Sequence, residues 1–512
     1  MSVRSEQLLY GGLVSSAEEH ASKVAIVAED GDATFSELLR RSLSLAGALQ
    51  DHGLEHGDRV ALFMENSLAC ASAVFGVLFA GGSFVMVNAQ TPEDRLRYIL
   101  DDSGASFLFA EGPLCRVAAR ARRVASSAPT LAFARAPADL EEDALDLLKL
   151  MTGGSDPSAG PASPSDLAAL LYTSGSSGTP KGVMLTHESL AFVTESIAKY
   201  LRLGFDDRIL NVLPLAFGYG LSQLLLTAHL GATLVLERSF AYPAETLRLL
   251  ELHAATVLPG IPTIFATFAS HFGHSGKTYP SVKTITNAAA SLPATLHGPL
   301  RKLFPNAAII RMYGQTECIR VCYLEPELVE QKPTSVGKAI PGSEAFVLDE
   351  DGGPVPPGVV GTLYVRGPHV MRGYWNAPEL TASRLSEDEG DPVLCTHDLF
   401  KTDADGDLYF VSRSDEIIKT RGEKVSPILV EETLFSLEGV KEAAVVGVPD
   451  ELLGEAIRAY VVREEGSSLE EAQVVRACRE QLEAFAVPHE VRFVDDLPKT
   501  PSGKVRRKSL PA

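Results

Sequence analysis

Apolar residues in the first half of the chain alternate between helical spacing and short runs with strand character. The helical pattern covers residues 35–52, 68–80 and 244–252, and the strand pattern covers 59–64, 233–236 and 255–258. Parallel strands need a crossover connection, usually a helix, so this alternation predicts a parallel sheet with helices packed on it. We therefore expect an α/β fold.

The length of the chain predicts more than one domain. A hydrophobic core stops growing at about 250–300 residues, and this chain has 512. Short strands flank the turn sequence DEDGGPVPPG at 349–358 and predict a β-rich part within the larger domain. Two strands (442–448 and 458–462) and a helix (469–485) then predict a small α+β domain. We expect an N-terminal domain of residues 1–413 and a C-terminal domain of residues 414–512.

Charge and composition exclude several classes of protein. The formal net charge of −20 repels nucleic acid and anionic membranes, so we expect neither as a partner. Six cysteines without metal-ligand spacing predict reduced thiols rather than a disulfide framework. The apolar stretches at 67–87 and 215–236 are diluted by Gly, Ala, Ser or His, which predicts buried core rather than membrane spans. No signal-peptide pattern opens the sequence, and we expect a cytoplasmic protein.

The most informative motif is YTSGSSGTPKG at residues 172–182. An apolar strand at 167–171 leads into it, and a helical pattern begins near His187. Glycines permit close approach, and backbone N–H groups, hydroxyls and the Lys181 ammonium can bind phosphate. Gly182 follows Lys181 where a Walker A loop has Ser or Thr, which excludes that loop. On composition alone, the segment could equally be a flexible surface loop.

Three further motifs carry polar residues suited to a nucleotide. The sequence RMYGQTE at 311–317 offers Tyr313 for stacking on a base and Glu317 for Mg²⁺, which prefers carboxylate oxygens. The segment 396–419 offers Asp398 for sugar hydroxyls, with Arg413 nearby. The sequence LPKTPSGK at 497–504 puts Lys504 after a glycine. Taken singly, each motif could be a turn, a solvated loop or a basic tail.

Together and in this order, the four motifs resemble those of the adenylate-forming superfamily, which contains acyl- and aryl-CoA synthetases, peptide-synthetase adenylation domains and luciferases. The resemblance spans about residues 35–504 and rests on the co-linear set. It implies a large N-terminal domain of layered α/β subdomains with a small β-barrel, and a small α+β C-terminal lid that rotates. ATP and a carboxylic acid would bind between the two.

The resemblance also implies a role for each matching residue. The β- and γ-phosphates of ATP would be wrapped by Thr173, Ser174, Gly175, Ser176, Ser177, Gly178, Thr179 and Lys181. Adenine would be contacted by Tyr313, Gly314, Ala288, Ala289 and Ala290, and the ribose by Asp398 and Arg413. Thr316 would contact the α-phosphate, Glu317 would hold Mg²⁺, and Lys504 would bridge the carboxylate and the α-phosphate. Asp415 matches the hinge, and Gly422 matches the loop that faces the site during thiol transfer.

The motifs depart from the family pattern at three places. His397 and Ser412 stand where the family often has glycine, directly before Asp398 and Arg413. The Gly-rich adenine segment of the family is Ala-rich here, at Asn287–Ala290. Asp398 and Arg413 themselves remain, so we expect them to keep their ribose contacts.

The acid pocket is expected to lie among residues 217–222, 261–265, 288–290 and the segment after Glu317, with substrate contacts from Phe217, Gly218, Tyr219, Ser222, Ile261 and Gln315. Peptide-synthetase domains for α-amino acids usually have Asp where Gly218 stands, and an unpaired ammonium is costly to bury. The sequence Phe-Gly-Tyr-Gly-Leu at 217–221 is instead similar to benzoate-type ligases. We expect a small aryl acid such as benzoate or an aminobenzoate. A short or branched acyl chain is the alternative if these aromatic residues only fill the core.

The expected reaction has two halves. With ATP and Mg²⁺, the acid becomes an acyl-AMP and pyrophosphate is released; the acyl group then passes to the thiol of CoA. The alternative acceptor is the phosphopantetheine of an acyl carrier protein, which ends in the same thiol. No Gly-x-Ser-x-Gly sequence supports a hydrolase. A non-catalytic nucleotide-binding protein would be expected to lack Lys504 or Glu317, and both are present.

Overall fold

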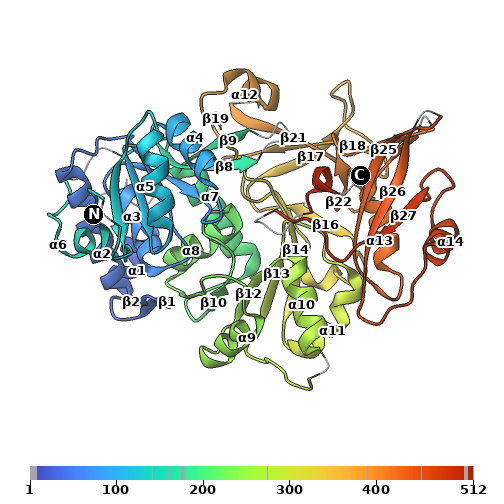
Figure 1. Ribbon diagram of the computed structural model, residues 1–512, viewed down its shortest axis with the longest axis horizontal. Coiled ribbons are helices and arrows are strands. Elements are labelled where there is room, and N and C mark those ends of the chain that lie inside the picture. The colour runs from blue at the N-terminus through green and yellow to red at the C-terminus, as the bar shows by residue number, and fades with distance from the viewer. Residues whose placement is uncertain are drawn as a thin grey trace.

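Three β-sheets organise the chain (Figure 1). The structure is a computed structural model that describes residues 8–140, 142–158, 162–174, 179–273, 275–388, 390–421, 423–450, 452–500 and 505–510. In Figure 1 the N-terminal elements lie at the left, the middle of the chain lies below the centre, and the C-terminal sheet lies at the right.

The largest sheet runs in the order β17-β18-β21-β22-β16-β15-β14-β13-β12-β10-β11-β1-β2, with β20 beside β21. Its parallel strands are β1 (Val24–Ala28), β10 (Arg208–Asn211), β11 (Thr233–Leu236), β12 (Val257–Gly260), β13 (Thr284–Asn287) and β14 (Ala308–Tyr313). Its antiparallel strands are β2 (Gly31–Thr34), β15 (Cys322–Tyr323), β16 (Ser335–Ala339), β17 (Glu344–Leu348), β18 (Gly361–Arg366), β20 (Leu385–Asp388), β21 (Asp391–Thr402) and β22 (Leu408–Arg413). The antiparallel run from β16 to β22 is the β-rich part that the sequence predicted.

The second sheet has the order β19-β9-β8-β4-β3-β5-β6-β7. Its strands are β3 (Arg59–Phe63), β4 (Ser83–Val87), β5 (Phe107–Glu111), β6 (Thr130–Ala134), β7 (Leu145–Asp146), β8 (Leu167–Ser174), β9 (Pro180–Thr186) and β19 (Gly373–Tyr374). The helices of the chain are α1 (Gly11–Glu19), α2 (Phe35–Asp51), α3 (Leu68–Phe79), α4 (Glu93–Ser103), α5 (Leu114–Val124), α6 (Leu147–Gly153), α7 (His187–Leu201), α8 (Gly218–Leu230), α9 (Pro243–Leu252), α10 (Pro262–Phe272), α11 (His297–Leu303), α12 (Pro378–Arg384), α13 (Pro427–Phe435) and α14 (Glu471–Gln481). Three 3₁₀ turns are η1 (Ala294–Leu296), η2 (Pro326–Leu328) and η3 (Arg507–Ser509).

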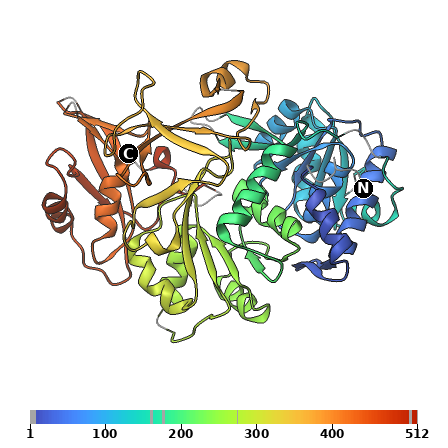
Figure 2. The same cartoon turned by 180° about the vertical axis from the view of Figure 1, so that it is seen from behind.

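The helices form three layers around the two large sheets. Helices α2, α3, α7 and α8 lie between the sheets, where Phe75 and Leu224 share one core with Leu62 of β3 and Leu234 of β11. Helices α4 and α5 cover the outer face of the second sheet, and α9, α10 and α11 cover the outer face of the parallel strands. This αβαβα layering confirms the predicted α/β class and is visible from both sides (Figures 1 and 2).

The small C-terminal domain has its own sheet and core. Strands β23 (Ile418–Thr420), β24 (Glu423–Val425), β25 (Val440–Asp450), β26 (Gly454–Arg463) and β27 (Glu490–Phe493) form the sheet. Helices α13 and α14 pack on it through Val430, Leu434 and Val474, which join Val445 and Val461 in one apolar cluster. A separate core of this kind is what lets a small domain hold its structure independently of its neighbour.

Most predicted elements are confirmed with shifts of one or two residues at their ends. Helix α2 covers 35–51 and α3 covers 68–79, while β12 begins two residues later than the sequence indicated. Helix α14 is shorter than predicted, spanning 471–481 instead of 469–485. Its start is set by a capping box between Glu470 and Gln473, which satisfies the first free N–H groups.

One prediction about local structure is wrong. The sequence suggested that the YTSGSSGTPKG segment joins a strand to a helix, but it joins β8 to a second strand, β9, in an antiparallel hairpin. Val183 and Leu185 of β9 are buried in alternation with half-buried Met184, which is the period of a strand. The helix α7 starts only at His187. Its N-terminus therefore does not follow the glycine-rich loop, and its dipole cannot supply the positive end there.

A half-buried lysine anchors the hairpin formed by β21 and β22. The Lys332 Nζ lies 2.8 Å from Asp403, 2.8 Å from Asp405 and 2.5 Å from Asp407, all in the turn between the two strands. Partial burial raises the pKa of Asp403. The hydrogen bonds that it accepts from Lys332, the Asp407 N–H and Tyr409 have the larger, opposite effect, and the net result is a pKa lowered to about 2. The turn is thus tied to the segment that precedes β16.

We predict that Lys332→Met destabilises the protein in a pH-dependent way. The folded pKa of Asp403 lies below its unfolded value near 4, so its contribution is present above pH 4 and is lost as the pH falls towards 2. The drop in melting temperature relative to the wild type should therefore be large at pH 7 and shrink below pH 4. Calorimetry across this range measures it, with the exposed Lys338→Met as the matched control. A drop that does not change with pH would contradict the account.

Candidate functional site

The glycine-rich segment lies at the tip of the β8–β9 hairpin. Thr173 pairs with Lys181 across the two strands. Lys181 is half-buried and Thr179 is exposed. The predicted phosphate contacts Gly175, Ser176, Ser177 and Gly178 lie outside the described residues, as does the side chain of Ser174.

The base of this hairpin is anchored on α4. The Tyr172 hydroxyl donates to Asp102 at 2.5 Å, and burial, together with that carboxylate, holds the pKa of Tyr172 well above its usual value. This hydrogen bond therefore fixes the end of β8 against α4, directly before the glycine-rich segment.

The sequence YGQTE brings its polar residues to the C-terminal end of β14. The Tyr313 hydroxyl donates to the Asp398 carboxylate. The Gln315 side-chain amide also donates to Asp398, at 2.8 Å, and to the Tyr313 oxygen at 3.0 Å. Asp398 is buried, with 7% of its surface exposed. The predicted adenine residue, ribose residue and one predicted substrate residue thus form a single hydrogen-bonded cluster.

Burial is the main cause that raises the pKa of Tyr313, and the neighbouring carboxylate of Asp398 adds to it. The phenol therefore stays protonated and remains a donor near neutral pH. The Asp398 carboxylate accepts these two hydrogen bonds and, with about four acceptor positions, can accept another from a ribose hydroxyl.

The β21–β22 hairpin places the two predicted ribose residues opposite each other. Asp398 of β21 is in register with Arg413 of β22. The Arg413 guanidinium donates to both oxygens of Asp415, the predicted hinge residue, at 2.9 and 3.2 Å. Burial lowers the pKa of Arg413, but Asp415 and Asp398 together raise it above its usual value. The guanidinium is therefore a fixed positive charge between the ribose position and the start of the C-terminal domain.

Two departures from the family pattern occur where the backbone is left-handed. His397, which stands where the family often has glycine, has φ of 56°. Ala289 in the adenine segment has φ of 73°. This conformation suits glycine and costs a side-chain-bearing residue about 1–2 kcal/mol. Both positions therefore adopt a conformation that glycine would take at lower cost.

The adenine segment leaves β13 at a buried asparagine. Asn287 is 2% exposed, and its amide donates to the Ala290 carbonyl at 2.9 Å. Ala288 is buried, whereas Ala289 and Ala290 are exposed. The two exposed alanines leave one face of this loop open to a flat ligand.

Glu317, the predicted metal ligand, is half-buried beyond the end of β14, as is Thr316. One Glu317 oxygen accepts a hydrogen bond from the Tyr374 hydroxyl at 2.6 Å. Burial, followed by the charge of Glu317, holds the pKa of Tyr374 above its usual value. A carboxylate has about four acceptor positions, so Glu317 keeps capacity for a cation.

The predicted acid pocket is built around the start of α8. Phe217 is the residue before the first turn of that helix. The Tyr219 hydroxyl bonds to the carbonyl and hydroxyl oxygens of Thr286 at 2.8 and 2.7 Å, so its ring is held against β13. The Ser222 hydroxyl donates to the Gly218 carbonyl at 2.6 Å within the helix. Ile261 precedes α10 and is half-buried.

Sequence reasoning missed a buried arginine beside this pocket. Arg320 is 2% exposed, and its guanidinium carbon lies 5.1 Å from the centre of the Tyr219 ring. The signal was present in the sequence, because Arg320 is the one charged residue in the otherwise apolar run Cys318–Tyr323.

The C-terminal domain holds the two remaining predicted residues, Gly422 and Lys504, which lie outside the described residues. Lys499 and Val505 form an antiparallel bridge, so the chain on either side of the segment 501–504 is paired. Arg507 binds Glu416 at 2.8 Å and Glu431 at 2.9 Å, which ties the C-terminal tail to the residue after the predicted hinge.

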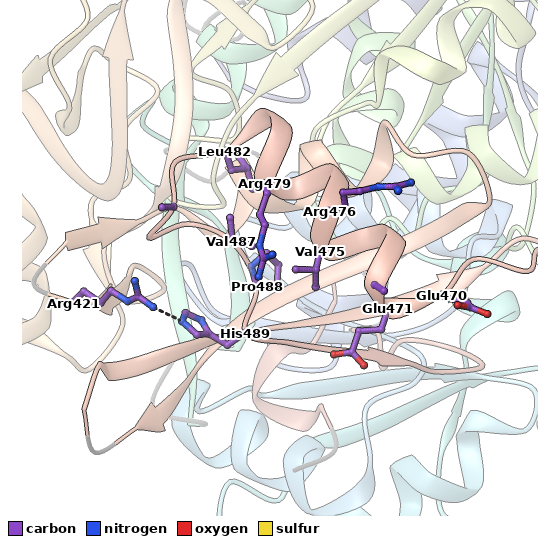
Figure 3. Close-up of a pocket in the computed structure, with 12 residues that line it drawn as sticks. Arg421, Glu470, Glu471, Val475, Arg476, Arg479, Leu482, Val487, Pro488 and His489 are labelled. Carbon is purple, nitrogen blue, oxygen red and sulfur yellow. Dashed lines mark hydrogen bonds between the residues drawn. The ribbon is translucent and has the colours of Figure 1, made fainter.

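A pocket of about 980 Å³ opens in the C-terminal domain, away from these motifs (Figure 3). Three arginines, Arg421, Arg476 and Arg479, line it together with His489 and the acidic residues Glu470 and Glu471. Arg421 and His489 approach each other at 3.4 Å. Arg421 directly precedes Gly422, so one wall of the pocket is continuous with the loop predicted to act in thiol transfer.

No helix in the described ranges is long and apolar enough to cross a membrane. Within the same ranges, the acidic group dense enough to suggest a metal site is Asp403, Asp405 and Asp407. The Lys332 ammonium already lies among these three carboxylates.

Comparison with known proteins places this geometry in a family. The chain is 30% identical to a long-chain-fatty-acid–CoA ligase of Bacillus subtilis (strain 168), over 97% of this chain and 93% of that protein. The crystal structure of ATP-bound MatB from Rhodopseudomonas palustris is 30% identical, with a TM-score of 0.89 over 98% of each chain. A benzoate CoA ligase from Burkholderia xenovorans LB400 is 28% identical, with a TM-score of 0.89 over 98% of this chain and 99% of that one.

Two family models match the chain. The model of the AMP-binding enzyme C-terminal domain matches residues 429–504. The model of the AMP-binding enzyme itself matches residues 13–375, which is more than half of the chain. This protein therefore belongs to the AMP-binding enzyme family.

Proposed function

We propose that the protein is an ATP-dependent acid–thiol ligase that forms an acyl-AMP and then transfers the acyl group to CoA. The observation that carries this proposal is the cluster of Tyr313, Gln315 and Asp398 beside Arg413, because it joins the base and ribose positions of a nucleotide site. The phosphate hairpin β8–β9 and Glu317 supply the rest of an ATP site. Family membership supports the same reaction class.

In the first half-reaction, a carboxylate oxygen attacks the α-phosphorus of ATP and pyrophosphate leaves. Both reactants are anions, so fixed positive charge must offset their repulsion. We assign that charge to Lys504, which would bridge the carboxylate and the α-phosphate. Glu317 would hold Mg²⁺, which neutralises phosphate charge when it is bound. Thr316 would donate to the α-phosphate, and Thr173, Thr179 and Lys181 would position the β- and γ-phosphates.

In the second half-reaction, the thiol of CoA attacks the acyl carbon and AMP leaves. Pyrophosphate has gone by then, and the thiol needs its own approach. We propose that the C-terminal domain, residues 414–512, rotates about Asp415 as a lid and brings Gly422 towards the site. In the structure Asp415 forms an ion pair with Arg413. Rotation about Asp415 would therefore either break this ion pair or move Arg413 together with the lid.

For the acid, we propose a small aryl carboxylic acid such as benzoate or an aminobenzoate. The residues expected to line the acid pocket combine two aromatic rings, Phe217 and Tyr219, with the small Gly218 and Ala288, a combination that suits a flat ring. Relatives in the family are named for acids as different as fatty acids and benzoate, so this preference rests on the pocket residues. The cytoplasmic location stays a prediction from the sequence.

The overall reaction is tested by product analysis. Purified enzyme with ATP, Mg²⁺, CoA and an aryl acid should release AMP and pyrophosphate and form an acyl thioester. Replacing CoA with a phosphopantetheine-loaded carrier protein tests the alternative acceptor. Release of ADP and phosphate instead of AMP would contradict the proposal.

Removing the Lys504 amine should affect one half-reaction. We predict that Lys504→Ala slows acyl-AMP formation about 10²–10³-fold, the size expected for one preorganised charge-stabilising donor. Thioester formation from supplied acyl-AMP should change much less. Arg506→Ala removes a nearby exposed cation and should leave adenylation at the wild-type rate. Equal losses in both half-reactions of Lys504→Ala would refute the assigned role.

A substitution at Gly422 should impair the second half-reaction and spare the first. Gly422→Leu is expected to leave acyl-AMP formation close to wild type and to reduce thioester formation at least 10-fold, because the side chain would block the thiol approach. Gly422→Ala, with its smaller side chain, should show a smaller defect. Rapid-quench measurement of each half-reaction checks this, and an unchanged thioester rate in the leucine variant would count against the lid rotation.

The ribose contact of Asp398 can be isolated with a thermodynamic cycle that combines one mutation of the enzyme with one change in the nucleotide. A hydrogen bond to a charged group contributes about 1.5–3 kcal/mol, so wild type should lose about 10- to 100-fold in kcat/KM when ATP is replaced by 2′- or 3′-deoxy-ATP. Asp398→Ala should be impaired with ATP but insensitive to at least one of these replacements. Additive losses with both deoxy analogues would show that Asp398 contacts neither hydroxyl.

A further inference from the structure

Arg320 is a buried cation without a partner among the residues that the structure describes. Its side chain forms no hydrogen bond or ion pair within those residues, and its Nε is buried without an acceptor. The contact that it does make is with the face of the Tyr219 ring, at 5.1 Å. A cation–π contact offsets only a small part of the cost of burying an unpaired guanidinium, so this position costs the free enzyme stability.

The groups around Arg320 cannot neutralise it. The ionisable side chains whose pKa it lowers include Tyr200 and Tyr219. Burial nevertheless raises the pKa of Tyr219 to about 12, so this phenol is neutral at physiological pH. The positive charge of Arg320 is therefore available to pair with an anionic ligand.

The backbone is strained at Ile319, the residue directly before the buried Arg320. Ile319 has φ of 61°, which is rare for a β-branched residue, and the Arg320 N–H donates across it to the Cys318 carbonyl at 2.6 Å. Strain of this kind persists where the surrounding structure holds it, and it is enriched at ligand sites.

Two glycines of the predicted site make room for this turn. A Cβ on Gly314 would lie 2.3 Å from the Ile319 oxygen, and a Cβ on Gly218 would lie 2.6 Å from the Ile319 side chain.

We propose that Arg320 binds a second anionic group on the acid substrate, so that the preferred substrates are dicarboxylic acids or similar doubly acidic compounds. One carboxylate reaches the α-phosphorus and the other pairs with Arg320 behind Tyr219. This inference rests on the proposed ligase function and narrows its substrate class: among aryl acids, the preferred substrate would not be benzoate or an aminobenzoate but an acid with a second acidic group on its ring or side chain.

The test compares matched acids that differ by one carboxylate. AMP release is measured for benzoate against phthalate, isophthalate and terephthalate, and for propanoate against succinate. Wild type should prefer one diacid over its monoacid partner by at least 10-fold in kcat/KM. Arg320→Met should reduce that diacid's kcat/KM about 10²-fold or more, as expected for removing one partner of a buried charge pair, and spare the monoacid. Arg320→Lys should restore part of the preference.

Two controls separate this role from a structural one. Arg311→Met removes another buried arginine, one that already donates to Ser291 at 2.8 Å, and should leave the diacid preference unchanged. The melting temperature of ligand-free Arg320→Met should equal or exceed that of the wild type, because an unpaired buried charge is removed. The preferred diacid should raise the melting temperature of the wild type and not that of Arg320→Met.

Each result decides one of the two proposals. Equal use of monoacids and diacids by wild type, or equal losses on both in Arg320→Met, would overturn the assignment of Arg320 while leaving the ligase reaction intact. Failure of every acid to release AMP would overturn the ligase proposal. The melting-temperature shift then still decides Arg320: a diacid shift lost in Arg320→Met supports the site, and no shift in the wild type overturns it.

Discussion

The carboxylate of Asp398 links the parts of the chain on which the site depends. It accepts hydrogen bonds from Tyr313, the last residue of β14, and from Gln315 just beyond it, although Tyr313 lies 85 residues earlier in the chain. Asp398 itself sits in the β21–β22 hairpin opposite Arg413. Removing a buried, hydrogen-bonded carboxylate leaves its donors unsatisfied, so the parallel sheet and the hairpin are held in a fixed relation here. A nucleotide bound at this point would touch both.

Charge is distributed around this cluster in a way that suits two anionic reactants. The protein as a whole carries −20, yet the residues nearest the candidate site include Lys181, Arg413 and the buried Arg320. The negative charge of the turn at Asp403–Asp407 is partly offset by Lys332, and the turn lies at the far end of the same hairpin. The negative surface therefore does not extend unopposed into the site. In a partly desolvated cleft, a few placed cations outweigh a distant net charge.

Much of the fold followed from the sequence because the relevant signals are local. The periodicity at residues 35–52 and 68–80 predicted helices that the structure has at 35–51 and 68–79, and the apolar alternation predicted the correct class. Strand β9, Pro180–Thr186, was missed because the glycine-rich segment before it has no side-chain period. Left-handed positions such as His397 and Ala289 could not be predicted, since neither residue type demands that conformation.

The candidate site was also predicted only in part: the sequence identified its motif residues but not the contacts between them. Tyr313, Asp398 and Arg413 were found as motif residues, and they lie together, but the direct bond between Tyr313 and Asp398 depends on pairing between distant strands. Arg320 was missed because one charged residue in an apolar run is usually solvent-exposed, whereas in the structure only 2% of its surface is exposed.

The central claim is that one cleft brings the substrate carboxylate to the α-phosphorus of ATP before any thiol takes part. Isotope exchange measures this step alone, by following labelled pyrophosphate into ATP in the absence of CoA. The account predicts incorporation that requires both Mg²⁺ and a carboxylic acid and that proceeds without a thiol acceptor. Absence of exchange across aryl, aliphatic and doubly acidic substrates, with folded and pure protein, would contradict it.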